Sequence, residues 1–187
     1  MKKLLSILKL LGVWALILLV FGVIFEIYLR NSTYVGKQTL TYTVNDQFGT
    51  WRIPNQRAVK VADCYQVDDI EVNSFGMRGA EPNGKKPIKV GFFGDSMLEG
   101  IQVNEQDHLV TRLNGANDTV DYLNFATSST TTVYHLLNLQ YHQPIFHLKK
   151  AVIFFFMNND IQENSIPLQL AMNGKRYYYP SYVPDGK

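Results

Sequence analysis

The sequence KVGFFGDSMLEG occupies residues 89–100 and combines an apolar run with a turn that contains a serine. A short apolar run, Val90–Phe93, ends at Gly94, Asp95 and Ser96. A run that is apolar on both faces and bounded by glycine is typical of a buried strand in a parallel sheet. In open α/β sheets, ligands bind just beyond the carboxyl ends of the strands. Ser96 is therefore a candidate nucleophile, although the same three residue types also serve ordinary turns.

The composition and charge of the chain exclude several classes of protein and of site. The chain has 187 residues, enough for one domain and an anchor, and a net charge of +2. That charge argues against a nucleic-acid-binding protein, which would be more basic. Cys64 is the only cysteine, so an intramolecular disulfide and a thiolate metal cluster are excluded. The four histidines are not spaced as metal ligands, and we expect neither a metal nor a cofactor.

Residues 1–30 are predicted to form a membrane anchor. An uncharged run, Leu10–Phe25, follows three lysines, and with Leu4–Leu8 the apolar span reaches about 20 residues, enough to cross a bilayer. A cleavable signal peptide is the alternative, but no small-x-small cleavage site follows Phe25. Because the lysines precede the span, the positive-inside rule predicts a single-pass protein of the cell membrane with a cytoplasmic N-terminus. The rest of the chain would then face the periplasm or the cell exterior.

Residues 31–87 are predicted to form a strand-rich lead-in and linker. Three short stretches have the alternation or the Pro and Gly boundaries of strands, and in the last of them Ile70 and Val72 share a face. They are Thr39–Val44, Trp51–Ile53 and Asp69–Asn73. A turn with two glycines follows at 73–79, and the polar stretch 81–87 leads into residues 88–187.

Residues 88–187 alternate predicted strands and helices. The strands are Ile88–Phe93, Val120–Phe125 and Ala151–Met157. Strand–helix–strand–helix–strand order indicates right-handed crossovers and a parallel sheet. Because the third strand is almost wholly apolar, we expect it at the centre of the sheet.

Two helices are predicted between these strands. The first begins at Asn104, whose side chain can cap it, and ends at 115–117. The second follows the Ser/Thr run Thr127–Thr132 and ends at Pro144. Its apolar residues at helical spacing are Val133, Leu136, Leu137 and Tyr141.

The C-terminal part differs in character. Four tyrosines lie close together at positions 177–182. They are predicted to form either an aromatic loop over a site or a hairpin that covers a sheet edge. The chain ends after Asp185 and Gly186, a strong two-residue hairpin signal. Only three parallel strands are predicted, and no strand follows the terminal turn. We therefore expect a domain that lacks its C-terminal part.

The three strand ends carry polar residues on one edge of the predicted sheet. Ser96 follows the first strand, Asn124 and the Ser/Thr loop the second, and Asn159 and Asp160 the third. Acyl transfer needs a nucleophilic oxygen and hydrogen-bond donors aimed at the developing oxyanion. The backbone N–H of Ser96, a backbone N–H near Ser129 and the side-chain amide of Asn159 could supply the donors. Asn159 could equally be a turn residue.

These blocks resemble the SGNH/GDSL hydrolases, a family of serine esterases, over about residues 45–165. The resemblance implies a flavodoxin-like three-layer α/β/α fold. It makes Ser96 the nucleophile of the block Gly94–Gly100, with Asn159 in the oxyanion hole. The pattern Asn73-x-x-Gly76-x-Arg78 is similar to the lead-in of membrane-anchored envelope members. The substrate implied is an acyl ester or an acetylated glycan, hydrolysed through an acyl-enzyme without a cofactor.

The chain departs from the family pattern in two ways. Ala126 and Ser129 stand where the second block usually has glycines, and a left-handed backbone would cost a serine about 1 kcal/mol or more. The family's base and its orienting acid come as Asp-x-x-His near the C-terminus, and no histidine follows His147. A general base must lie within about 3 Å of the hydroxyl. None of the earlier histidines is predicted there; His142, for example, lies on the order of 20 Å away along its helix.

Three functions therefore remain open from the sequence. The first is a membrane-anchored esterase or deacylase. The second is an O-acyltransferase that uses the same nucleophile with a hydroxyl of an envelope glycan as acceptor. The third is a catalytically inactive binding module of the same fold.

Overall fold

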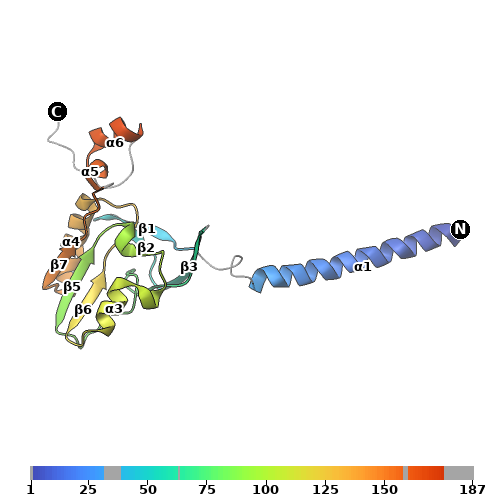
Figure 1. Cartoon of the computed structure of the whole chain (residues 1–187), viewed down its shortest axis with the longest axis horizontal. Coiled ribbons are helices and arrows are strands. Elements are labelled where there is room, and N and C mark those ends of the chain that lie inside the picture. Colours follow the sequence, from blue (N-terminus) through green and yellow to red (C-terminus); the bar gives the residue numbers. More distant parts are fainter. Residues whose placement is uncertain (1, 32–38, 63, 158–159, 175–187) are drawn as a thin grey trace. The chain divides into compact units, whose positions relative to one another are not determined.

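The computed structural model describes residues 2–31, 39–62, 64–157 and 160–174. The chain divides into two compact units, residues 1–38 and residues 39–187. The second unit is a mixed α/β structure around a small parallel sheet (Figure 1). The predicted tyrosine-rich loop and the terminal Asp185–Gly186 turn lie outside the described residues.

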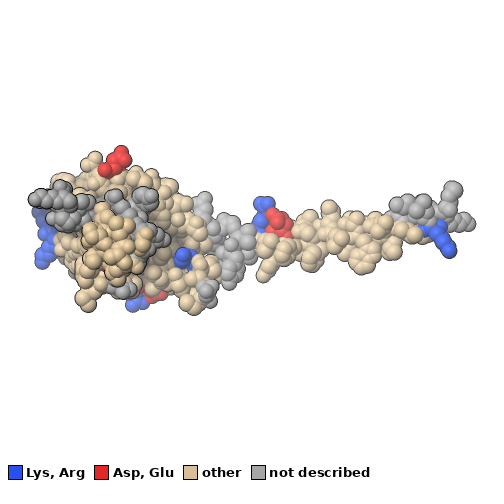
Figure 2. Space-filling view, turned by 90° about the horizontal axis from the view of Figure 1, so that it is seen from above, with Lys and Arg blue, Asp and Glu red and all other residues tan. Residues whose placement is uncertain are grey.

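The first unit is one long helix, α1 (Lys2–Asn31). Within it Lys9–Arg30 has a mean hydropathy of 2.6 and is long and apolar enough to cross a membrane. Charged side chains mark the two ends of this helix and leave an uncharged stretch between them (Figure 2). The predicted membrane-spanning helix is thus present by length and composition.

The second unit is built on three parallel strands in the order β6-β5-β7 (Figure 1). They are β5 (Ile88–Phe93), β6 (Val120–Asn124) and β7 (Lys150–Ile153). Val90 pairs with Tyr122 on one side and Lys150 on the other, which places the carboxyl ends of the strands together. The predicted parallel sheet is confirmed, and Val90–Phe93 is buried throughout.

The expectation of a central third strand was wrong. β5 is central, and β7 lies at an edge of the three-stranded sheet with all four residues exposed in the part of the chain that is described. Apolarity on both faces indicates only what a strand can bury. It does not determine the strand order, which depends on the direction of each crossover.

The crossover helices differ from prediction at their ends. After the short helix α2 (Ser96–Glu99) comes the 3-10 helix η1 (Glu105–Asp107), and then α3 (Leu109–Gly115). His108 caps α3 by accepting from the N–H of Val110, so Asn104 is not the cap. The Asn104 side chain instead accepts from the N–H of Asp68 in the lead-in.

The second crossover helix, α4 (Thr132–Phe146), runs past Pro144. A proline in the last turn forfeits only one backbone bond, so the helix can continue for two residues. The predicted apolar face is also wrong, because Leu136 and Tyr141 are exposed. The residues that α4 buries are Tyr134, His135, Asn138, His142 and Phe146. Two short helices, α5 (Asp160–Glu163) and α6 (Ile166–Asn173), follow β7.

The lead-in forms two antiparallel pairs. β1 (Tyr42–Asn45) pairs with β2 (Gly49–Arg52), and β3 (Gln56–Ala62) pairs with β4 (Tyr65–Val72). Three of these strands were predicted and β3 was not. Ile70 and Val72 are both buried, as their shared face predicted.

The lead-in and the parallel sheet share a hydrophobic core. Phe48, Trp51 and Met77 join Phe93 and Phe125 on the sheet face that α4 covers. The opposite face packs Val90, Phe92 and Leu98 against Val110 of α3. Helices therefore cover both faces of the sheet, and the lead-in closes one side of the core.

Candidate active site

The nucleophile candidate begins the short helix α2. Asp95 is buried and caps this helix, because its Oδ1 accepts from the N–H of Met97 at 2.9 Å. Ser96 is the first helical residue and is half-buried. The helix ends at Gly100, whose φ of 66° is left-handed and whose N–H donates to the Ser96 carbonyl at 3.1 Å. Ser96 is thus held in a tight strand-to-helix turn at the end of β5.

Gly94 leaves no room for a side chain in this turn. A Cβ there would lie 2.9 Å from the Leu98 side chain and 3.1 Å from the Cβ of Phe154. The Gly94 carbonyl accepts from the N–H of Thr127 at 3.1 Å, which ties the turn to the loop after β6. The first and second sequence blocks are therefore in direct contact.

The loop after β6 is fixed by its own side chains. Asn124 accepts from the N–H of Ala126 at 3.0 Å, and the Thr130 hydroxyl donates to the Thr127 carbonyl at 2.5 Å. Ser129 has a φ of 57°, which is the left-handed conformation that is unfavourable for a serine. A strained serine between fixed neighbours is compatible with a directed backbone N–H, as an oxyanion donor requires.

The end of the third strand contributes a buried carboxylate. The Phe154 N–H donates to the Phe93 carbonyl at 2.8 Å, so β5 and the chain after β7 stay side by side. Asp160 Oδ2 accepts from the N–H of Phe156 at 2.7 Å. Burial raises the Asp160 pKa, and the nearby charge of Asp95 raises it further. The predicted oxyanion residue Asn159 lies outside the described residues.

Two buried carboxylate oxygens lack a partner among the described residues. They are Asp95 Oδ2 and Asp160 Oδ1. Such oxygens are costly unless water or a ligand satisfies them. Across the same residues, no group of three or more His, Cys, Asp or Glu side chains could hold a metal ion.

His135 lies beside the nucleophile turn but is fully buried. Its Nε2 lies 3.2 Å from the Thr130 hydroxyl, and the Gly94 carbonyl is close enough to stabilise its charged form. Burial outweighs this and lowers the His135 pKa to about 4. No hydrogen bond between Ser96 and a histidine occurs within the described part of the chain.

His108 connects three elements of the site. Because its Nδ1 accepts from the Val110 N–H, its proton sits on Nε2, which donates to the Leu98 carbonyl at 3.1 Å. Asn124 Nδ2, 3.3 Å from the same nitrogen, is then a close neighbour rather than a donor to it. Burial, followed by the charge of Arg78, lowers the His108 pKa. Both ring nitrogens are engaged, so His108 is a structural residue here.

A buried ion pair that the sequence did not single out lies under the site. Arg52 Nη1 donates to Glu99 Oε1 at 2.7 Å, and both side chains have 0% exposure. Glu99 also accepts from the backbone N–H and the hydroxyl of Ser128. Its position one helical turn after Ser96 was the only signal in the sequence.

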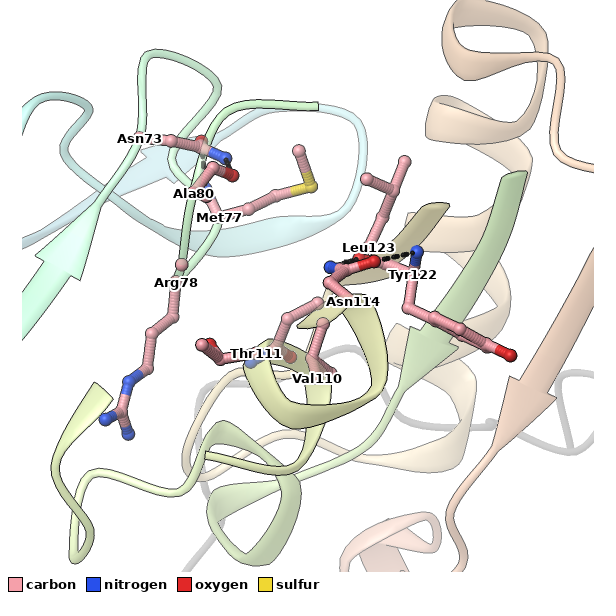
Figure 3. A pocket seen from close by; sticks show the side chains of 11 residues that line it. Asn73, Met77, Arg78, Ala80, Val110, Thr111, Asn114, Tyr122 and Leu123 are labelled. Carbon is pink, nitrogen blue, oxygen red and sulfur yellow. Dashed lines mark hydrogen bonds between the residues drawn. The ribbon is translucent and has the colours of Figure 1, made fainter. Parts of the chain in front are cut away.

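Arg78 holds the far end of the α2 segment. Its Nη1 donates to the Glu99 carbonyl at 3.0 Å and its Nη2 to the Val103 carbonyl at 2.6 Å. The side chain runs along one side of a cavity of about 60 Å³ that Asn114 and Leu123 also line (Figure 3). Ser96 does not line this cavity, which has room for little more than water.

Comparison of the sequence with protein-family models and with curated proteins gave no match.

Proposed function

We propose that the chain is a membrane-anchored serine hydrolase of the SGNH/GDSL type, acting on an acyl ester. Ser96 Oγ would attack the acyl carbonyl, the alcohol would leave, and water would release the acyl group. The observation that carries the proposal is the contact between the Ser96 turn and the Ser129 loop through Gly94 and Thr127. It supports the proposal because acyl transfer requires a nucleophile and a backbone donor close together, and the carboxyl ends of parallel strands are where such sites form.

The wider proposal includes the fold and the topology. Numbered along the chain, the three parallel strands lie in the spatial order 2-1-3, and helices cover both faces of the sheet. This arrangement supports a flavodoxin-like three-layer fold. The lysines before the span of α1 favour a cytoplasmic N-terminus and a domain on the outer side of the membrane. Ester or acetylated glycan substrates of the cell envelope would lie on that side.

An activity-based probe tests the function. A fluorophosphonate reacts only with an activated serine, so the full-length gene product should be labelled at Ser96, as located by peptide mass spectrometry. Ser96→Ala should fold and lose the label. Folded wild-type protein that stays unlabelled would contradict the serine hydrolase.

A binding module is the second candidate, because no histidine hydrogen-bonds to Ser96 in the described residues. Under the hydrolase proposal, a base that does not contact Ser96 in this structure accepts the Ser96 proton. Transfer to a glycan hydroxyl would use the same acyl-enzyme and is distinguished by its product: an acylated acceptor instead of free acid.

A further inference from the structure

The buried pair Arg52–Glu99 joins the two halves of the proposed site. Glu99 lies on α2, one turn after Ser96, and Arg52 ends β2 of the lead-in. Neither side chain is accessible to solvent. A buried ion pair is weak evidence of stability, since its desolvation penalty can exceed its attraction. A reason for this pair must be sought in what it holds in place.

Glu99 receives four hydrogen bonds. Its Oε1 accepts from Arg52 and from the Tyr42 hydroxyl at 3.2 Å. Its Oε2 accepts from the Ser128 N–H at 2.7 Å and from the Ser128 hydroxyl. Burial, followed by the negative charge of Glu99, raises the Tyr42 pKa, so the tyrosine stays a donor. The carboxylate thus fastens the residue before Ser129 to the helix that carries Ser96.

Arg52 holds the same loop through its backbone at Ala126. Its Nη1 also donates to the Ala126 carbonyl at 2.5 Å, and its Nε donates to the Gly76 carbonyl at 2.8 Å. The guanidinium carbon lies 4.6 Å from the centre of the Trp51 ring. The lead-in therefore supplies a cation that contacts the loop backbone and neutralises Glu99.

We propose that Arg52 and Glu99 are positioning residues of the candidate oxyanion site, holding the 126–129 segment, and with it the candidate donor Ser129, against the turn that carries Ser96. The inference rests on the proposed function for its catalytic consequence. Its structural part, control of the loop by the ion pair, stands independently. Each part has its own measurement.

The double variant Arg52→Met with Glu99→Met removes both charges and retains buried volume. Replacing a buried pair by apolar residues is often tolerated, whereas removing one partner leaves an unpaired charge. The double variant should therefore fold, with Ser128 N–H losing its acceptor. Amide exchange at Ser128 and Ser129, measured by NMR or mass spectrometry, should quicken at least 10-fold, while β5 amides stay protected. This readout does not require Ser96 to react.

The catalytic part is read on the full-length gene product. Fluorophosphonate labelling of Ser96 and ester turnover should slow by on the order of 100-fold, comparable to loss of one oxyanion donor, with KM nearly unchanged. Glu99→Gln should likewise slow labelling and turnover while leaving KM nearly unchanged. A glutamine presents one acceptor and one donor group, and so cannot satisfy both Arg52 and Ser128.

The exposed pair Arg57–Glu71 of the lead-in is the matched control. Arg57→Met with Glu71→Met should leave loop exchange and labelling rate unchanged. If the buried double variant folds with wild-type exchange at Ser128 and Ser129, the positioning role is refuted. If exchange quickens but wild-type Ser96 never labels, the ion pair does position the loop and it is the proposed hydrolase that fails.

Discussion

A side chain at Gly76 would meet a direct obstacle. It has a φ of 80°, and a Cβ would overlap the Trp51 indole and lie 2.8 Å from the Arg52 carbonyl. The turn that it occupies is already fixed, because Asn73 accepts from the N–H groups of Phe75 and Met77. A side chain here would push on the same Arg52 that contacts the proposed site.

Gly76→Ala should therefore lower the free energy of unfolding by about 2 kcal/mol or more, from the left-handed backbone and from overpacking. Urea unfolding followed by fluorescence measures this. Gly84→Ala is the control, since nothing lies within 4 Å of a Cβ at that exposed position. Equal midpoints for the two variants would contradict the crowding.

Arg52 and Ile53 show at the residue scale where sequence reasoning stops. The strand at this position was predicted, yet the arginine is buried and the isoleucine is 42% exposed. A hydrophobic pattern assigns apolar residues to the core and cannot anticipate that a carboxylate arrives from Glu99, 47 positions along the chain. The buried pair could be found only from tertiary structure.

Two side chains cap the N-terminus of α4, since Asn164 Oδ1 accepts from the N–H of Val133 and the Thr131 hydroxyl accepts from the next residue. Thr131 Oγ1 accepts from the N–H of Tyr134 at 3.1 Å, and Thr131 is fully buried. Thr131→Val keeps the shape and removes the cap, so it should destabilise the protein by about 1 kcal/mol. Thr131→Ser keeps the acceptor and should recover most of that loss in thermal unfolding. If valine and serine are equally stable, the hydroxyl does not cap the helix.

α4 also explains why its buried face was predicted wrongly. The helix was anticipated, but its apolar stripe was placed at Leu136 and Tyr141, both exposed. The face it buries contains polar groups that find partners only in the folded protein. Asn138 donates to the Phe125 carbonyl, and the Tyr134 hydroxyl donates to the Thr50 carbonyl. Polar residues satisfied across elements defeat a reading based on periodicity alone.

α1 gives a prediction about membrane attachment. A charge at the middle of a spanning helix costs about 2.5 to 3.5 kcal/mol on insertion scales, whereas one near the end can reach the interface. Leu16→Arg should therefore shift protein from the carbonate-resistant membrane pellet to the supernatant, and Tyr28→Arg should not. Full retention of the Leu16 variant would argue against a spanning helix.

At the scale of the whole molecule, buried histidines make stability depend on pH. Burial lowers the pKa of His135 and of His142 to about 4 in the folded state, against 6.5 when exposed. The unfolded chain then binds more protons as pH falls below 6.5. The free energy of unfolding should therefore fall by about 1.4 kcal/mol per pH unit for each histidine down to about pH 4.

Urea unfolding at pH 7.5, 6.5 and 5.5 measures this dependence. His142→Gln should remove the contribution of one titrating histidine from the slope of unfolding free energy against pH below pH 6.5. An unchanged slope in the His142 variant would contradict a neutral, buried imidazole.

The sequence anticipated the architecture better than it anticipated the site's support. Apolar runs separated by helical segments suffice to predict a parallel sheet with its strand ends together, and with them the positions of Ser96 and Ser129. Asp95 as a cap follows from local sequence. The roles of His108 and Glu99 do not. His108 donates to the Leu98 carbonyl of α2, and Glu99 accepts from Arg52, Tyr42 and Ser128, which lie in three separate parts of the chain. Long-range polar contacts are the part that no local pattern encodes.

The last prediction concerns residues 1–187 as an isolated protein, which should not hydrolyse p-nitrophenyl acetate in a Ser96-dependent way. A serine hydroxyl is a weak nucleophile without a base. His108 has both ring nitrogens engaged, and His142 is packed among aromatic rings. His135 is the nearest alternative, since it lies beside Gly94.

Activity that disappears in Ser96→Ala would overturn this prediction, and its pH profile would then identify the base. With His135 as base, turnover should persist down to about pH 4, the pKa that burial gives this imidazole. His135→Gln should abolish such activity, whereas His147→Asn, which alters an exposed histidine outside the core, should not. Inactivity of the 187-residue protein, together with Ser96 labelling in the full-length gene product, would place the base outside these residues.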